Sequence, residues 1–306
     1  MVKASWLVSV GICATLLQIN VPPSIAQTVL PYAPALDSEE LEQEGIRLVE
    51  DAIQLSTLQQ YDIALPYAKL ATQLAPEMYQ SWFVLGTIYS ETDRVQEAIP
   101  ILEKARKMKP NQGGIFFSLG SAYFKLGQYQ KSVNEINLGL KLEPDSANAW
   151  FDLGNNYLML KNYTEAVTAY RTALKHDSAF WPATNNIGLV RYEQGNAPEA
   201  ISQWEMAITQ IGQSAEPQLA IAVANYTEAL RLEQQGQTTT ARIQKKNALI
   251  QGQSAIALDS RYGELDYLRK NLWGEQLLID SQAFLNDKEI QEFLKQIKDG
   301  FNDISL

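Results

Sequence analysis

The chain has 306 residues, a formal net charge of −10, one histidine and one cysteine. The acidic balance argues against nucleic acid as a partner, because a phosphate backbone is repelled by such a body. One histidine and one cysteine leave too few ligands for a zinc site and no basis for a Cys–His catalytic pair. The sequence also lacks nucleotide-binding and nucleophile motifs. We therefore expect no cofactor, no metal and no catalytic residues, and interpret the protein as a non-enzyme.

The N-terminal segment has the layout of a secretory signal peptide. Lys3 is followed by an apolar run from Trp6 to Ile19 and by the sequence SIA at residues 24–26. A basic start, an apolar run of this length and small residues before a cut are typical of such signals. We expect residues 1–26 to be a signal peptide, with export of a chain that begins near Gln27. The alternative is that residues 4–19 remain as a membrane anchor.

Residues 27–44, which contain two prolines, are expected to be a flexible lead-in. Beyond them a Leu-Gly pair, or Ile-Gly in its last copy, recurs with its glycine at positions 86, 120, 154 and 188, a step of 34 residues. Other positions keep the same step. An aromatic residue stands at Trp82, Phe116 and Trp150, and prolines stand at 76, 110 and 144. A fixed period of this length indicates a repeat architecture and not an ordinary globular core.

These positions resemble the tetratricopeptide repeat, in which a Trp-x-x-Leu-Gly-x-x-Tyr helix is followed by a second helix and a closing proline. Trp150, Leu153 and Tyr157 have the spacing of one apolar stripe on a helix. Gly127 and Gly195 are expected to adopt the left-handed conformation in the turn after the first helix of a pair. The fold class expected is all-α, a right-handed superhelical solenoid of stacked antiparallel helix pairs with a C-terminal helical cap.

The repeat pattern predicts five repeats between residues 45 and 212. Their boundaries are 45–78, 79–112, 113–146, 147–180 and 181–212. The first is the weakest, since Asp51 occupies a leucine position. A degenerate, elongated helix pair is expected at 213–262 and a helical cap at 263–306, because terminal repeats of a solenoid are atypical.

Stacked helix pairs of this kind present a concave groove that is lined mainly by first helices. The register places in it the residue after each aromatic position and the residues four and seven further on. The predicted partner-binding residues are Phe83, Thr87, Phe117, Ser121, Phe124, Phe151, Asn155, Leu158, Asn185, Leu189 and Tyr192, with Ser90 at the remaining position. Packing within the repeat framework is the alternative for each aromatic side chain. The amides of Asn155 and Asn185 are expected to bond a partner's backbone.

None of these groove positions carries Lys or Arg. Tetratricopeptide modules that hold acidic chaperone C-termini use such residues to clamp carboxylates, so we do not expect a carboxylate-clamp adaptor. The expected partners are client proteins that offer apolar or uncharged polar segments, as a helix or as an extended strand. Membrane proximity follows if the N-terminal segment is kept.

The C-terminal run YLRKNLWGEQLLIDSQAFL, residues 267–285, resembles the ends of tetratricopeptide proteins of cyanobacteria and chloroplasts. Several of those proteins assist photosystem assembly or bind pigment-synthesis enzymes. The resemblance implies an assembly factor in the periplasm or thylakoid lumen. A membrane-tethered adaptor and an enzyme with its site in residues 215–306 are the alternatives.

Overall fold

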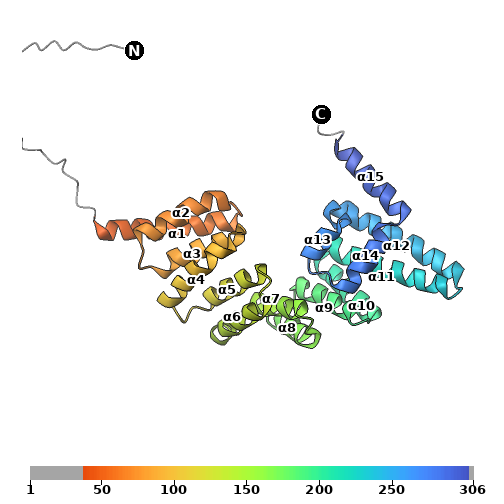
Figure 1. Ribbon diagram of the computed structural model, residues 1–306, viewed down its shortest axis with the longest axis horizontal. Helices are drawn as coiled ribbons and strands as arrows, with labels where there is room; N and C mark the ends of the chain where they lie inside the picture. Colours follow the sequence, from red (N-terminus) through yellow and green to blue (C-terminus); the bar gives the residue numbers. More distant parts are fainter. Residues whose placement is uncertain (1–36, 303–306) are drawn as a thin grey trace, which may run out of the picture. The chain divides into compact units, whose positions relative to one another are not determined.

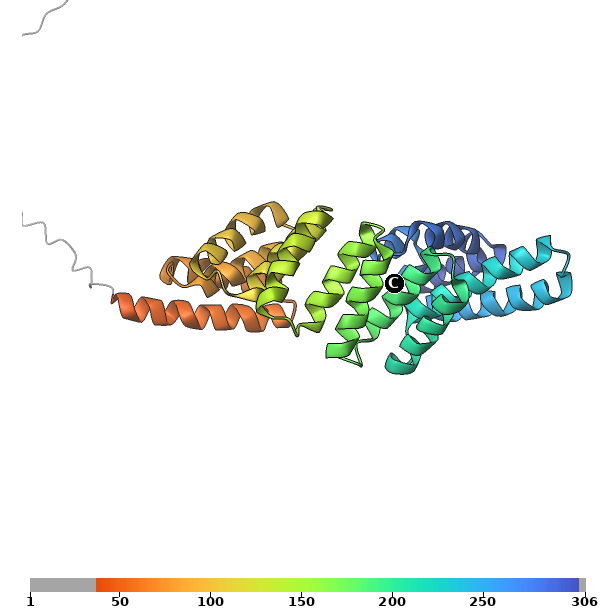
Figure 2. The same ribbon diagram turned by 90° about the horizontal axis from the view of Figure 1, so that it is seen from below.

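The computed structural model describes residues 37–302, and the side chains of residues 37–299. The expected signal peptide or anchor, and most of the lead-in, lie outside these residues. Within the described range the chain forms fifteen α-helices and one 3-10 turn, without a strand. The predicted all-α stack of helix pairs is confirmed (Figure 1, Figure 2). No helix between residues 37 and 302 combines the length and the apolar character needed to cross a membrane.

Five short helix pairs occupy the first two thirds of the described chain. They are α1 (Ser38–Thr57) with α2 (Tyr61–Leu74), α3 (Tyr79–Glu91) with α4 (Val95–Met108), α5 (Gly113–Lys125) with α6 (Tyr129–Leu142), α7 (Ala147–Met159) with α8 (Tyr163–His176), and α9 (Trp181–Glu193) with α10 (Ala197–Ile211). Helix α1 begins at Ser38 and not at residue 45, so the expected lead-in is helical over its last residues. Two acidic side chains in the first turn, Glu39 and Glu40, favour the start of this helix by complementing its dipole.

The turn inside each pair has one residue in the left-handed conformation. These residues are Gln59, Asp93, Gly127, Lys161 and Gly195, with φ between 58° and 76°. Their spacing is again 34 residues, so the prediction for the two glycines is confirmed. In three of the five repeats a residue with a side chain takes the same backbone, which the sequence pattern did not indicate.

Four of the five short pairs, from α3–α4 to α9–α10, are held together by a glycine on the first helix that receives a large side chain from the second helix. A Cβ atom on Gly86 would lie 2.7 Å from Leu102, on Gly120 2.6 Å from Ile136, and on Gly154 2.5 Å from Tyr170. Gly188 receives Trp204 in the same way. These four large side chains, which we call the knobs of the pairs, are all buried. The recurring glycine is therefore explained by the close approach of the two helices.

A longer pair and a folded-back tail complete the described part of the chain. Helices α11 (Ala215–Gln234) and α12 (Thr238–Leu258) are followed by a 3-10 turn, η1 (Ser260–Gly263), and by α13 (Leu265–Lys270), α14 (Glu275–Leu285) and α15 (Lys288–Asn302). Helix α14 packs against α9 and α11 (Figure 1). Its Phe284 is fully buried and lies against Gly252 of α12.

Replacing Gly154 by alanine tests the packing of these pairs. The added methyl group would clash with the ring of the buried Tyr170, so we expect a loss of about 1–3 kcal/mol in the free energy of unfolding. Urea denaturation of the purified protein measures it. Gly114→Ala is the control, because a Cβ there meets Phe83 at an ordinary 3.5 Å and alanine favours a helix by up to about 1 kcal/mol. Equal midpoints for Gly154→Ala and wild type would contradict this packing.

Candidate functional site

An open groove of about 560 Å³ lies between the first helices of the first two repeats. Such a volume is within the range of sites that bind ligands or side chains of a partner. Its lining comes from α1, from the start of α2 and from α3. The lining residues are Ile53, Ser56, Thr57, Tyr61, Tyr79, Gln80, Phe83, Val84, Thr87, Ile88 and Glu91.

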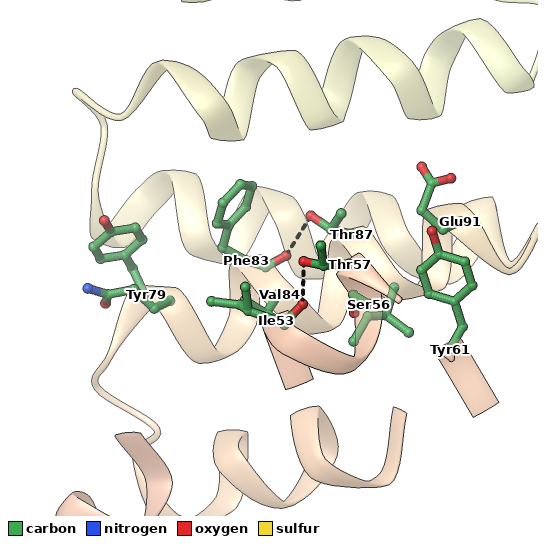
Figure 3. A pocket seen from close by; sticks show the side chains of 11 residues that line it. Ile53, Ser56, Thr57, Tyr61, Tyr79, Phe83, Val84, Thr87 and Glu91 are labelled. Carbon is green, nitrogen blue, oxygen red and sulfur yellow. Dashed lines mark hydrogen bonds between the residues drawn. The ribbon is translucent and has the colours of Figure 1, made fainter. Parts of the chain in front are cut away.

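The groove is mainly apolar, with a polar end. In Figure 3 the rings of Tyr79 and Phe83 lie toward one end, and Tyr61 lies beside Glu91 at the other. The hydroxyl of Thr87 donates to the Phe83 carbonyl oxygen at 3.0 Å, so this hydroxyl is satisfied within its own helix. Ile53 is 48% exposed although it is a large aliphatic side chain. Glu91 is the one charged residue of the lining.

Two of the predicted partner-binding residues, Phe83 and Thr87, line this groove. Three others, Ser121, Phe124 and Asn155, line a second and smaller pocket of about 60 Å³ between α5, α6 and α7. The register of the repeats therefore brings these five side chains to two neighbouring openings. That they bind a partner stays a prediction.

Three predicted residues are used inside the repeat framework. The ring of Phe117 lies against Gly139 of α6. Phe151 packs against Tyr170 and Phe180, with ring centroids 5.7 and 5.2 Å apart. Leu158 is 5% exposed within the core around α8 and α9. These side chains are oriented into the helix pairs, which is the alternative that the sequence left open for the aromatics.

The predicted residues of α9 are buried by the helices that follow α9 in the chain. Asn185 and Leu189 are each 1% exposed and Tyr192 is 5% exposed, so the expectation of an open groove at these positions is corrected. The Tyr192 hydroxyl donates to Asp280 of α14 at 2.6 Å. The chain's own tail, and not a partner, therefore occupies this part of the concave face.

The docked helix α14 is also held at its N-terminus. Glu193, the last residue of α9, accepts hydrogen bonds from the backbone N–H groups of Gln276 at 3.2 Å and Leu277 at 3.0 Å. The first N–H groups of a helix have no partner within the helix, and a carboxylate both satisfies them and complements the helix dipole. Leu277 is fully buried between the helices.

Asn155 belongs to a buried polar chain that links three helices. Its Oδ1 accepts from the hydroxyl of Tyr170 at 2.8 Å and from Nδ2 of Asn186 at 2.9 Å. Nδ2 of Asn185 in turn donates to Oδ1 of Asn186 at 3.1 Å. The amide oxygen of Asn155 is thus engaged within the protein. That the Asn155 amide bonds a partner's backbone stays a prediction.

Several lining residues were missed at the sequence level, although the signal was present. Ile53 and Ser56 stand 34 residues before Thr87 and Ser90. Extending the same register into the weak first repeat would have identified them. Tyr61 comes from the start of a second helix, where the register of first helices gives no information.

Residues 37–302 contain no group of three or more His, Cys, Asp or Glu side chains that could hold a metal ion. One desolvated carboxyl group near the tail nevertheless has a raised pKa. Glu216, in the first turn of α11, accepts from Nε1 of Trp273 at 3.3 Å and lies 3.5 Å from the hydroxyl of Tyr262. Burial raises its pKa to about 7, against the opposing effects of Asn185, Trp273 and Tyr262. Trp273 and Tyr262 belong to the tail and Asn185 belongs to α9, so this carboxyl group links the tail to the repeats.

The stability of the fold should depend on the protonation of Glu216. Between pH 4.5 and 7 the folded protein keeps a proton that the unfolded chain has lost, so stability falls as the pH rises and levels off above pH 7. Relative to the Glu216→Gln variant, wild type should lose about 1–3 kcal/mol between pH 5 and pH 8. Urea denaturation of both proteins at each pH gives the difference. Parallel pH profiles would show that Glu216 ionises normally.

Two family models described as tetratricopeptide repeat match the chain, one over residues 79–112 and the other over residues 117–179 and 154–216. No curated protein matches the sequence. Among solved structures, pilF of Pseudomonas aeruginosa is similar with 14% identity and a TM-score of 0.57, covering 76% of this chain and 97% of that chain. A thermophilic TPR protein of Thermus thermophilus, TTC0263, is similar with 20% identity and a TM-score of 0.51, covering 60% and 98%.

A third structure, YrrB, is described as a TPR protein with an unusual peptide-binding site. It has 22% identity, covers 56% of this chain and 89% of its own, and has a TM-score of 0.45. The pilF and TTC0263 structures show the fold. The family models identify tetratricopeptide repeats over residues 79–112 and 117–216.

Proposed function

We propose that the protein is a non-catalytic scaffold or assembly factor that holds an apolar segment of a client protein in the groove between α1 and α3. Tetratricopeptide repeats generally mediate protein–protein interactions. The observation that carries the proposal is the open, largely apolar lining of this groove, with the half-exposed Ile53 at its surface. Exposed apolar surface of this kind is a mark of an interaction site.

The protein's own tail supports a helix as the form of the bound segment. Helix α14 lies on the same first-helix surface further along the stack, with Leu277 and Phe284 buried and Asp280 bonded to Tyr192. An amphipathic helix that lays its apolar face into a groove is a common mode of recognition. The concave surface of this chain thus accepts a helix with apolar anchors and one polar contact.

The direction of the client helix follows from an equivalent residue. Glu91 ends α3 as Glu193 ends α9, and the two positions are separated by three steps of 34 residues. Glu193 binds the first N–H groups of α14. We place the N-terminus of the client helix at Glu91, at the end of the groove where Tyr61 lies (Figure 3). Lys125 lies 3.3 Å from Glu91, and a lysine at this distance leaves carboxylate lone pairs for backbone donors.

The setting is a further part of the proposal. Residues 1–26 favour export, and residues 267–285 resemble tetratricopeptide proteins of photosynthetic membranes. On these two segments alone we propose a role in photosynthetic complex assembly, or in the association of pigment-synthesis enzymes, in the periplasm or thylakoid lumen. A chain that keeps residues 4–19 as an anchor would perform the same binding as a membrane-tethered adaptor.

A matched pair of isoleucine variants tests the groove. Ile53→Asp places a carboxylate in the apolar lining, where it loses water when the client binds, so affinity should fall at least about tenfold. Ile63→Asp on α2 is the control, because Ile63 is similarly exposed, at 52% against 48%, and lies outside the lining. Affinity capture from the host with wild type and both variants identifies the clients, and calorimetry with the captured segment measures affinity.

If both isoleucine variants lose the same clients, or if both keep them, the clients do not bind in this groove. A proline in the middle of the bound segment then separates the two binding modes, since a helix is disrupted by it and an extended segment need not be.

The N-terminus of the protein from its host tests the setting. We expect a mature chain beginning near Gln27, because the cut follows small residues at positions 24 and 26. Intact-mass spectrometry of the protein from fractionated cells measures it. Recovery of a chain with residues 1–26 in the membrane fraction would instead support the anchored adaptor.

A further inference from the structure

The second pocket differs in chemistry from the groove. It has a volume of about 60 Å³ and is lined by residues of α5, α6 and α7. At about 15 Å³ for each water-sized group, it has room for about four such groups. Its lining residues are Ser121, Phe124, Ser132, Ile136, Asp152, Asn155 and Asn156.

Two fully buried polar atoms of this lining have no hydrogen-bond partner among the described residues. They are Oγ of Ser132, a residue with 0% exposure, and Oδ1 of Asn156, with 1% exposure. Nδ2 of Asn156 donates to the Asp152 backbone carbonyl at 2.8 Å, which fixes the amide and leaves its oxygen unpaired. A buried polar atom without a partner costs about 1–3 kcal/mol. Such atoms around a cavity indicate that a polar group fills it.

The third acceptor is the carboxyl group of Asp152. It is largely buried, and no described residue forms a hydrogen bond or an ion pair with it. Glu216, the other desolvated carboxyl group discussed above, is hydrogen-bonded. Asp152 is therefore unusual among the described residues as a desolvated carboxyl group without a donor.

These polar groups are not needed for the repeat fold. The position of Ser132 is alanine in three other repeats, at Ala98, Ala166 and Ala200, and those alanines are also fully buried. The position of Asp152 is Val84 in the repeat of α3, Ser118 in that of α5 and Asn186 in that of α9. The repeat fold therefore requires neither a hydroxyl group at position 132 nor a carboxyl group at position 152, and these two groups call for another explanation.

The arrangement selects the chemistry of the occupant. Asp152, Asn156 and Ser132 all present acceptor oxygens, and the ammonium group of lysine offers three donors in a compact form. The planar guanidinium group of arginine presents five donors in a rigid fork and needs more room. The small volume and the number of acceptors therefore favour the ammonium group.

We propose that this pocket binds the side-chain ammonium group of one lysine of the client segment, between the Asp152 carboxylate, Asn156 Oδ1 and Ser132 Oγ. The inference rests on the proposed function, since it places the lysine in the segment that occupies the neighbouring groove. The client segment was expected to be uncharged, and the proposal adds one lysine to it.

Binding of this lysine is linked to pH. Burial, with a smaller effect of the nearby Glu91 charge, raises the pKa of Asp152 to about 7. Of the other elements around Asp152, α8 contributes Tyr170, α5 contributes Ser121 and Phe124, and α6 contributes Ser132 and Ile136. Lys125 of α5 pairs with Glu91 instead. Below pH 7 the ammonium group must displace a proton from Asp152, so affinity falls as the pH is lowered, by about tenfold between pH 8 and pH 6.

The test uses the full chain and a small probe, Nα-acetyl-lysine N-methylamide, followed by saturation-transfer NMR. The matched probe is Nα-acetyl-norleucine N-methylamide, which has a similar alkyl chain and no charge. We expect saturable binding of the lysine probe alone, about tenfold weaker at pH 6 than at pH 8. In Asp152→Asn the binding should fall at least about tenfold and its pH dependence should disappear.

Ser132→Ala is the second variant, since alanine already occupies this position in other repeats and folding should be unaffected. We expect it to weaken the lysine probe severalfold. Equal binding of both probes, equal binding of the lysine probe by wild type and Asp152→Asn, or no saturable binding would overturn the proposal and leave the pocket to water. Stronger binding of the corresponding arginine probe would also overturn it.

The two proposals fail separately. Loss of clients in Ile53→Asp together with no lysine-probe binding would leave the groove function standing and reject the lysine pocket. Lysine-probe binding that depends on Asp152, with clients indifferent to Ile53→Asp, would keep the pocket and reject the groove.

Discussion

The close approach of paired helices at a glycine is the constraint on which the rest of the structure depends. At Gly86, Gly120, Gly154 and Gly188 the absence of a side chain admits a large residue of the second helix. A pair closed in this way is thin, and its remaining apolar surface can be covered only by the next pair. Stacking is thus a consequence of pair geometry, and it leaves the other surface of the first helices available as a concave face.

The chain uses that concave face in two ways. Over α9 and α11 it is filled by the chain's own tail, whose Phe284 enters a space left by a glycine, as the knobs of the helix pairs do. Over α1 and α3 it remains open and apolar. The same surface is therefore covered in one part of the molecule and open in another. For this reason, the residues with which the tail binds indicate which residues a bound client segment would need.

Much of the fold could be predicted because its determinants are local and periodic. The step of 34 residues indicates the helix pairs, and the glycines at 127 and 195 indicate the turns. The candidate site was predictable only in part. Phe83 and Thr87 follow from the register, but Phe117 has the same register position and is instead oriented into the space beside Gly139. Burial of Tyr192 depends on a contact with Asp280, a residue far along the chain, and no periodic pattern reports such a contact. Asp152 was missed because its significance comes from having no partner, which only three-dimensional surroundings reveal.

The knobs that enter the glycine positions differ in size along the chain, from Leu102 and Ile136 to Tyr170 and Trp204. The hydroxyl of Tyr170 also donates to the amide oxygen of Asn155. Each first helix is therefore matched to its own second helix, and exchanging second helices between repeats would create either a void or a collision. The repeats are regular in sequence, but the two helices of each pair are complementary in shape only to one another. Duplication or shuffling of single repeats in this chain would therefore require compensating changes in both helices of a pair.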